Sequence, residues 1–284
     1  MELRHRFVFR GNAAAFGGRI VRPEDVVLDM PGASSLTVVG GRSVATIDRT
    51  PPSFKDFVAF ESASTLAEGS FDSLKGLIGL SNHTVQEYTL KASTHVRAEI
   101  KKLTVGRKRR LSVDRLTAEM RSSSPTASGE PPIKLGDVAA EGVRIDGFEL
   151  KVEFERKLFQ QQDTRAKLLT VADDPAFVRK YGRHFFMTTD FAGRPAPPAG
   201  RFVPGGETIY ATIVKSLGWR AKPNPDARID HHSVVVKDFG TIFFGELFIT
   251  SASRRLTMMR LELGSDEGGS VGGPEIDING SWSP

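Results

Sequence analysis

The chain contains 284 residues, among them 39 lysines and arginines, 34 aspartates and glutamates and no cysteine. This length allows one large or two medium domains, and the lack of cysteine excludes disulfides, thiolate metal sites and cysteine nucleophiles. No window approaches the roughly 18 uninterrupted apolar residues of a transmembrane helix. The first residues carry charges within their apolar run, unlike a signal peptide. We therefore expect a soluble, cytoplasmic protein without a transmembrane segment.

Short apolar runs separated by glycine and proline dominate the first part of the chain. Residues 3–9 alternate weakly, and residues 26–28 and 36–39 are β-branched runs bounded by turn residues, a pattern typical of strands. Residues 84–121 continue as two or three strands. Along them the apolar side chains change parity twice, which predicts a β-bulge.

The second part of the chain has clearer patterns. Residues 148–154 alternate between apolar and charged side chains, as in a strand with one buried and one wet face. Asp174 and Pro175 are suited to the N-cap and first turn of a short helix. Asp163 is suited to cap another helix that ends at Val171. We expect these helices to lie over the sheet or to close one end of it.

The segment 231–263 holds the densest concentration of β-branched and aromatic residues. Its apolar residues fall on both parities, Val234, Val236, Ile242, Phe244 and Phe248 on one and Val235, Phe239, Phe243, Leu247 and Ile249 on the other. Because side chains of a strand alternate between its faces, this predicts a central strand that is covered on both sides. Residues 254–263 then form the return strand of a hairpin.

These patterns predict a mainly β protein, a two-layer sandwich-like arrangement of antiparallel sheets with a few short helices. The expected divisions are a β-rich half at 1–121, a mobile loop or linker at 122–132, a second β-rich half at 133–264 and a flexible tail at 265–284. A single compact domain is the alternative. The likeness of RRLSVDRL at 109–116 to RRLTMMRL at 254–261 is explained either by an ancient duplication or by chance.

Positive charge is concentrated in one segment. Of the formal +5, residues 97–121 contribute nine basic and three acidic side chains, or +6, so the other residues sum to −1. Clustered cationic groups attract phosphates and carboxylates. The hairpin is therefore predicted to bind an anionic partner through Lys101, Lys102, Arg107, Lys108, Arg109 and Arg110. A solvated turn is the alternative, and nucleic acid is disfavoured because no aromatic residues for base stacking are interleaved with the charges.

Asp230, His231 and His232 have the composition of a reactive site. Imidazoles beside a carboxylate can act as general bases or bind a metal. Consecutive residues of a strand point to opposite faces, however, so these two imidazoles would share a metal only in a loop. The sequence has neither the HExxH spacing of zinc enzymes nor a serine nucleophile elbow between a strand and a helix. We expect no metal and no other cofactor.

The sequence thus favours a non-enzymatic β-rich binding or assembly module. Strand-rich units can pair through their edges with other copies, and the basic hairpin adds a candidate surface for an anionic partner. The alternative is a hydrolase or metal-dependent enzyme centred on Asp230, His231 and His232.

Overall fold

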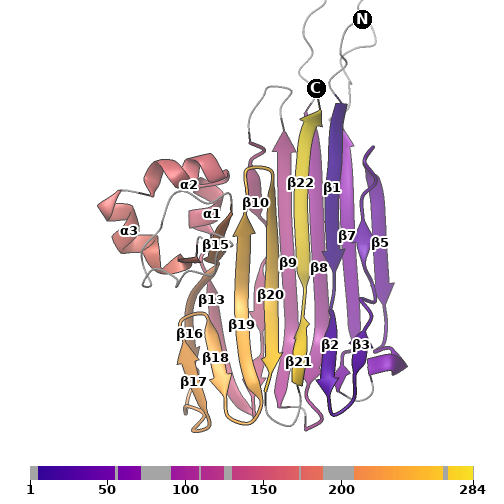
Figure 1. Ribbon diagram of the computed structural model, residues 1–284, viewed down its shortest axis with the longest axis vertical. Helices are drawn as coiled ribbons and strands as arrows, with labels where there is room; N and C mark the ends of the chain where they lie inside the picture. The colour runs from indigo at the N-terminus through magenta and orange to yellow at the C-terminus, as the bar shows by residue number, and fades with distance from the viewer. Residues whose placement is uncertain are drawn as a thin grey trace, which may run out of the picture.

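The computed structural model describes residues 6–54, 57–71, 91–108, 110–124, 130–172, 174–187, 208–264 and 268–283. In these residues two antiparallel sheets pack face to face, and short helices lie at one side (Figure 1). The prediction of a mainly β, two-layer sandwich with a few short helices is confirmed.

Sheet 1 contains twelve strands and has the predicted hairpin at its centre. This hairpin pairs β19 (Gly240–Ile249) with β20 (Ser253–Leu263). The other strands are β1 (Arg6–Ala14), β2 (Gly17–Arg22), β3 (Val26–Leu28), β4 (Ser34–Ser35), β14 (Phe185–Met187), β15 (Ile209–Thr212), β17 (Ala227–Asp230), β18 (Ser233–Val236), β21 (Gly268–Gly272) and β22 (Glu275–Ser283).

Sheet 2 contains ten strands, and its longest members, β8 (Ala92–Val105) and β9 (Leu111–Ser124), form the hairpin that carries the basic turn. The other strands are β5 (Gly41–Ile47), β6 (Val58–Ala59), β7 (Ser62–Phe71), β10 (Ile133–Leu135), β11 (Ala139–Glu141), β12 (Val143–Ile145), β13 (Phe148–Phe154) and β16 (Val214–Trp219). The sheet begins at β5 and ends at β16.

One side of the sandwich is closed by a strand that passes from one sheet to the other. Only Ile213 separates β15 in sheet 1 from β16 in sheet 2. Its N–H donates to the carbonyl of Gly245 at 2.8 Å, while its own carbonyl accepts from the N–H of Glu155 at 2.7 Å. Ile213 therefore ties the sheets together at a corner, as in other sandwiches whose strands switch sheets.

The helices pack against this same side, as Figure 1 shows. They are α1 (Lys157–Gln161), α2 (Arg165–Val171) and α3 (Pro175–Tyr181), followed by a short 3-10 turn at Gly182–His184. Another 3-10 turn, at Pro52–Phe54, lies beside β3 at the other side of the sandwich. Asp174 caps α3 as predicted, because its side chain accepts from the N–H of Ala176. The cap predicted at Asp163 is wrong by one residue, since the Thr164 side chain accepts from the N–H of Lys167 and begins α2.

A buried arginine fastens α1 to sheet 1. The side chain of Arg254 donates to the carbonyls of Phe159 at 3.3 Å and Gln162 at 2.7 Å. Both carbonyls belong to α1 or its end, so they accept from a charged donor in place of the next helical turn. Burial lowers the pKa of Arg254 to about 10.

The parity changes predicted in 84–121 are confirmed, and they lie opposite each other. Lys101 pairs with Arg115 and Leu103 with Val113, so Lys102 and Asp114 leave the ladder at the same level of sheet 2. Lys102 has a φ of +53°. In both strands the buried side chains switch parity at this level. Gly142, with a φ of +61°, continues the interruption between β11 and β12.

Sheet 1 is interrupted in the same manner. Gly245, with a φ of +60°, lies where Phe244 pairs with Met259 and Glu246 with Thr257. The interruption continues in the neighbouring strands. Beside β20, β21 ends and β22 begins in the same register, and the β2–β21 and β1–β22 pairs likewise keep one register across the gap between them. We call the interrupted level of each sheet its offset row. The row contains Gly245, Met258, Gly273–Pro274 and Ala15–Phe16 in sheet 1 and Lys102, Asp114 and Gly142 in sheet 2.

The offset row corrects the prediction that β19 is covered on both faces. Ile242 and Phe244 before Gly245, and Leu247 and Ile249 after it, are all buried. Apolar residues therefore occur at both odd and even positions because the core-facing parity of the strand changes at Gly245. Phe243 and Phe248 on the other face are only partly buried.

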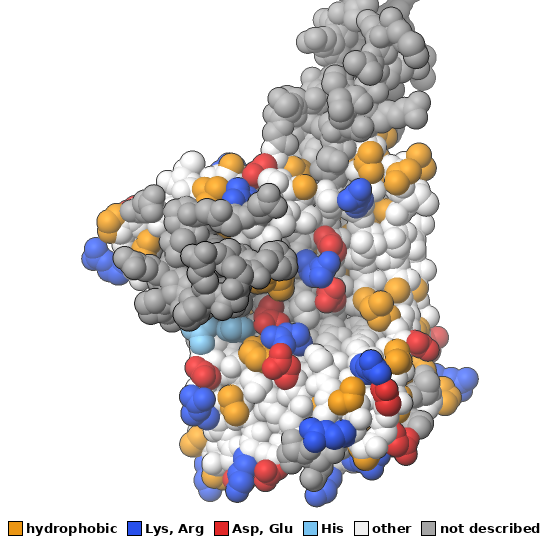
Figure 2. Space-filling view, in the orientation of Figure 1, with side chains coloured by type: hydrophobic (Ala, Val, Ile, Leu, Met, Phe, Trp, Pro, Cys, Tyr) orange, Lys and Arg blue, Asp and Glu red, His pale blue; other side chains and the backbone are white. Residues whose placement is uncertain are grey.

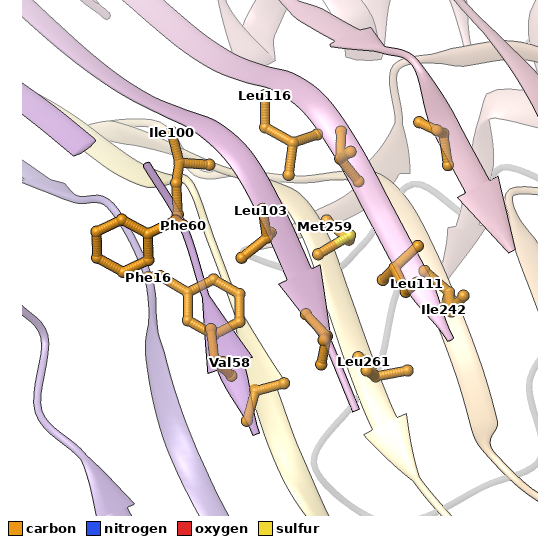
Figure 3. Packing of buried hydrophobic residues seen from close by; sticks show 14 of the residues in the cluster. Phe16, Val58, Phe60, Ile100, Leu103, Leu111, Leu116, Ile242, Met259 and Leu261 are labelled. Carbon is orange, nitrogen blue, oxygen red and sulfur yellow. The ribbon is translucent and has the colours of Figure 1, made fainter. Parts of the chain in front are cut away.

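Most of the buried apolar side chains form two clusters. The first lies largely below the row, also includes Ile100 and Leu116 on the other side of it, and contains Phe60, Leu103, Met259 and Leu261, which converge from both sheets (Figure 3). A second cluster above it contains, among others, Val96, Ala118, Met120, Leu247, Ile249, Ile276 and Ile278. Each sheet thus directs its side chains inward on both sides of the row despite the change in parity.

The predicted flexible tail is wrong for residues 268–283. β22 pairs with β1 along its whole length and also with β20. Ile276 and Ile278 are fully buried, so the alternating EIDI outweighs the glycine-rich and acidic composition. Sheet 2 also contains strands from both predicted halves of the chain, and Ser122–Ser124 belong to β9. Residues 125–129, 265–267 and 284 lie outside the described residues.

Replacing Gly245 by alanine tests whether the offset row needs its left-handed backbone. A Cβ at Gly245 would lie 2.7 Å from the Ile213 side chain, and a non-glycine residue with this φ is strained. We expect Gly245→Ala to lower the free energy of unfolding in urea by about 1–3 kcal/mol. The matched control is Gly218→Ala, whose Cβ would meet nothing within 4 Å. Equal stability of the two variants would contradict this account.

Candidate functional site

One end of sheet 2 is an exposed strand. β5 pairs with β7 through seven register positions, and none of its residues is buried. Within the described residues no further strand pairs with its outer edge. The strand contains no proline and no bulge, the usual devices that block edge pairing. Exposed valines lie on it and just before it, since Val44, Val38 and Val39 are 55%, 63% and 79% exposed.

The six basic residues predicted to bind an anion do not form one cluster. Lys101 lies 3.5 Å from Glu99, and Lys102 lies 3.1 Å from Asp114. Both are therefore ion-paired on the sheet. Arg107 and Lys108 are exposed at the turn after β8. Arg109 lies outside the described residues.

Arg110 connects the two sheets at the base of the β8–β9 hairpin. Its guanidinium makes two hydrogen bonds of 2.8 Å to the Asp146 carboxylate and donates to the carbonyls of Lys237 and Asp238. It also lies 5.1 Å from the centre of the Phe239 ring. The hydrogen bonds from Arg110 lower the pKa of Asp146. Arg110 thus joins sheet 2 to the β18–β19 turn of sheet 1.

Asp230, His231 and His232 lie at the turn between β17 and β18. His231 has a φ of +55°, so the turn brings both imidazoles together, with their Nδ1 atoms 2.9 Å apart. The Asp230 carboxylate lies 3.3 Å from Arg228. The two histidines therefore lie in a turn, the arrangement in which adjacent imidazoles can face each other. The carboxylate beside His232, however, is not that of Asp230.

That partner is Glu246, which follows Gly245 on the outer face of sheet 1. Its carboxylate accepts two hydrogen bonds from Arg260, at 2.6 and 2.7 Å, and lies 3.8 Å from Nε2 of His232. Burial alone would raise the pKa of Glu246, but the hydrogen bonds from Arg260 and the nearby His232 imidazole outweigh it and lower the pKa to about 2. The Arg260 guanidinium lies 4.1 Å from the centre of the Phe243 ring. Figure 2 shows histidine side chains near acidic and basic side chains on this face.

The outer face of sheet 2 carries a network of carboxylates and arginines. Glu99 accepts from Arg97, Arg115 and Thr117. Arg115 also binds Asp137 at 2.6 Å and Glu141 at 3.0 Å. Burial opposes ionisation of Glu99, yet the bonds from Arg115 and Arg97 lower its pKa.

Above this network Glu119 forms the floor of a pocket. Its carboxylate accepts from His95 at 2.9 Å, Arg121 at 2.8 Å and the N–H of Asp137 at 3.1 Å. The pocket measures about 630 Å³. It is lined by Glu119, Arg121, Ser122, Ser123, Pro132, Lys134, Leu135, Gly136, Asp137 and Gln160.

Sequence reasoning counted Glu119 and Arg121 only as charges and overlooked Lys134 and Gln160. The alternation of Thr117, Glu119 and Arg121 on one face of β9 was a usable signal. The positions of Lys134 and Gln160 beside them depend on the register of β10 and the packing of α1. Those contacts join residues that are distant in sequence.

With this geometry in place, comparison with known proteins gives the family. Residues 7–250 match the family described as Domain of unknown function (DUF8256), and the chain belongs to it. No curated protein and no solved structure matches the chain.

In the described part of the chain, no group of three or more histidine, aspartate and glutamate side chains is arranged to hold a metal ion. No helix there has both the length and the apolar character needed to cross a membrane.

The stability of the fold should depend on pH through its buried histidines. His184 is 1% exposed and its Nδ1 lies 2.9 Å from the carbonyl of Thr212. Burial lowers the pKa of His184, and partial burial lowers the pKa of His95. The contribution of these histidines to the free energy of unfolding is therefore complete above their pKa in the unfolded chain, about 6.5, and is lost as the pH falls through and below that value.

We expect the free energy of unfolding, measured in urea from neutral to mildly acidic pH, to fall as the solution becomes more acidic than about 6.5. His184→Gln should flatten this dependence, because an amide can donate to the Thr212 carbonyl without titrating. A wild-type protein that became more stable on acidification in this range would contradict the assignment.

Proposed function

We propose that this protein is a non-enzymatic assembly module in which β5 of sheet 2 pairs with β5 of a second copy. The observation that carries the proposal is the exposed, proline-free edge strand of seven residues. Unpaired N–H and C=O groups on such an edge are a template for another strand. Antiparallel pairing of two copies would continue sheet 2 through a two-fold axis.

The exposed valines support this choice of edge. A two-fold axis through the middle of β5 would set Val44 opposite Val44 of the second copy, with Ser43 opposite Ala45. Directly opposed side chains in an antiparallel pair have Cβ atoms about 4.5–5.5 Å apart. Val44 would then be buried against its equivalent, and Val38 and Val39 lie in the turn that precedes β5. Burial of a valine contributes roughly 1.5 kcal/mol or more.

An anionic partner forms the second part of the proposal. Arg107 and Lys108 lie at the exposed turn after β8, while Lys102 and Arg110 are engaged with Asp114 and Asp146. The proposed contact with an anionic partner therefore involves the turn residues Arg107 and Lys108, and not all six basic residues. Attraction between exposed charges of this kind is screened by salt.

The enzyme alternative is favoured by one observation. Glu246, His232 and His231 form a line in which a buried carboxylate lies beside one imidazole and that imidazole contacts the next. Such a line can orient a general base. Glu246 is, however, bound twice by Arg260, which equally suits an ion pair that stabilises sheet 1. We therefore place this reading second.

A pair of opposite charges at Val44 tests the pairing directly. Val44→Lys sets like charges opposite each other across the two-fold axis, which is destabilising in a cross-strand pair. We expect the wild-type protein to form dimers in sedimentation velocity and both Val44→Lys and Val44→Glu to be monomeric. An equimolar mixture of the two variants should recover dimers, because lysine then faces glutamate.

The matched control is Val27→Lys on β3, where the valine is 61% exposed and belongs to sheet 1 instead of sheet 2. This variant should dimerise like the wild type. A wild-type protein that stays monomeric at every concentration, or a Val27→Lys variant that dissociates as fully as Val44→Lys, would refute pairing through β5.

A further inference from the structure

Three basic side chains lie side by side across the outer face of sheet 2. His95 on β8 is the register partner of Arg121 on β9, and Arg121 is the register partner of Lys134 on β10. Like charges directly opposite each other destabilise a sheet. Arg121 and Lys134 form such a pair, and both are largely exposed, at 66% and 59% of their side-chain surface.

The nearby carboxylates are already bound by other groups. Glu119 accepts from His95, Arg121 and a backbone N–H. Asp137 binds Arg115 at 2.6 Å and lies within 4 Å of Arg97 and Arg156. Lys134 is less well matched, since its nearest carboxylate is Asp163 at 3.9 Å, and Asp163 binds Lys167 at 2.7 Å. The site therefore favours a further anion over a cation.

Both basic side chains line the pocket above Glu119. Its volume of about 630 Å³ lies within the range of small-molecule sites, about 300–1,000 Å³, and exceeds what a bare ion requires. Pro132 adds apolar surface, while the Ser123 hydroxyl and the Gln160 amide add neutral hydrogen-bonding groups. This mixture of apolar walls with a few polar groups is typical of sites for organic ligands.

We propose that the pocket between β9, β10 and α1 binds a small organic anion through Lys134 and Arg121. The anionic group, a carboxylate or a phosphate, lies between the Lys134 ammonium and the part of the Arg121 guanidinium that faces away from Glu119. Glu119, which also accepts from His95, holds Arg121 in place from below. The rest of the ligand lies along Pro132, within reach of Ser123 and Gln160. This site is separate from β5 and does not depend on self-association.

Titration of the full chain, followed by amide chemical shifts in NMR, tests the proposal. The probes are inorganic phosphate, glutarate and uncharged glutaramide, at about 0.15 M salt so that exposed charges are screened. Glutarate or phosphate should produce saturable shifts centred on residues 121–123 and 134–137, and glutaramide should not. Binding of only one of the two anions identifies the group that the pocket accepts.

Lys134→Gln should weaken binding of the anion about tenfold, the usual effect of losing one charge-assisted hydrogen bond. The control is Lys151→Gln, which removes an equal charge from a side chain of similar exposure, 62%, on β13. It should change the affinity less than twofold. The inference is overturned by an absence of saturable shifts, by equal weakening in the two variants, or by equal binding of glutaramide.

Discussion

Alternation of side chains along a strand is the constraint on which this structure depends. When one strand gains a residue and its neighbours do not, all the apolar side chains beyond that residue turn to the other face of the sheet. Here β8 and β9 change parity opposite each other, at Lys102 and Asp114, so their register is kept on both sides. Sheet 1 achieves the same result with Gly245 opposite Met258. Matched interruptions let long strands cross both core clusters and remain apolar inward throughout.

The offset row also places charged groups on the outer faces. Gly245 shifts the phase of β19, so that Glu246 points outward beside Arg260 and His232 while Leu247 points into the core. In sheet 2, Asp114 leaves the ladder and lies within 4 Å of both Lys102 and Arg144. Ion pairs thus gather where the ladder is interrupted. A local cluster of charges next to such a row can therefore stabilise the sheet, and its presence alone does not indicate a reactive site.

The difference between what the sequence predicted and what it missed follows from how far apart the interacting residues lie. The phase change in 84–121 was predictable because buried positions could be counted along one strand. The same feature in 233–250 was misread, since apolar residues on both parities also indicate a strand covered on both faces. Ile276 and Ile278 were hidden by the glycine-rich residues around them, although they alternate as a strand requires. The pairing of Arg121 with Lys134 needed the register of β10, which no local pattern contains.

The two ends of sheet 2 differ in a way that bears on assembly. At one end the chain passes from β15 in sheet 1 through Ile213 into β16, so this end is bent into the corner of the sandwich. At the other end β5 runs straight beside β7, with all of its residues at least partly exposed. Two equivalent edges that pair about a two-fold axis use up both edges. Association through β5 alone would therefore stop at two copies, whereas a sheet open at both ends could add copies without limit.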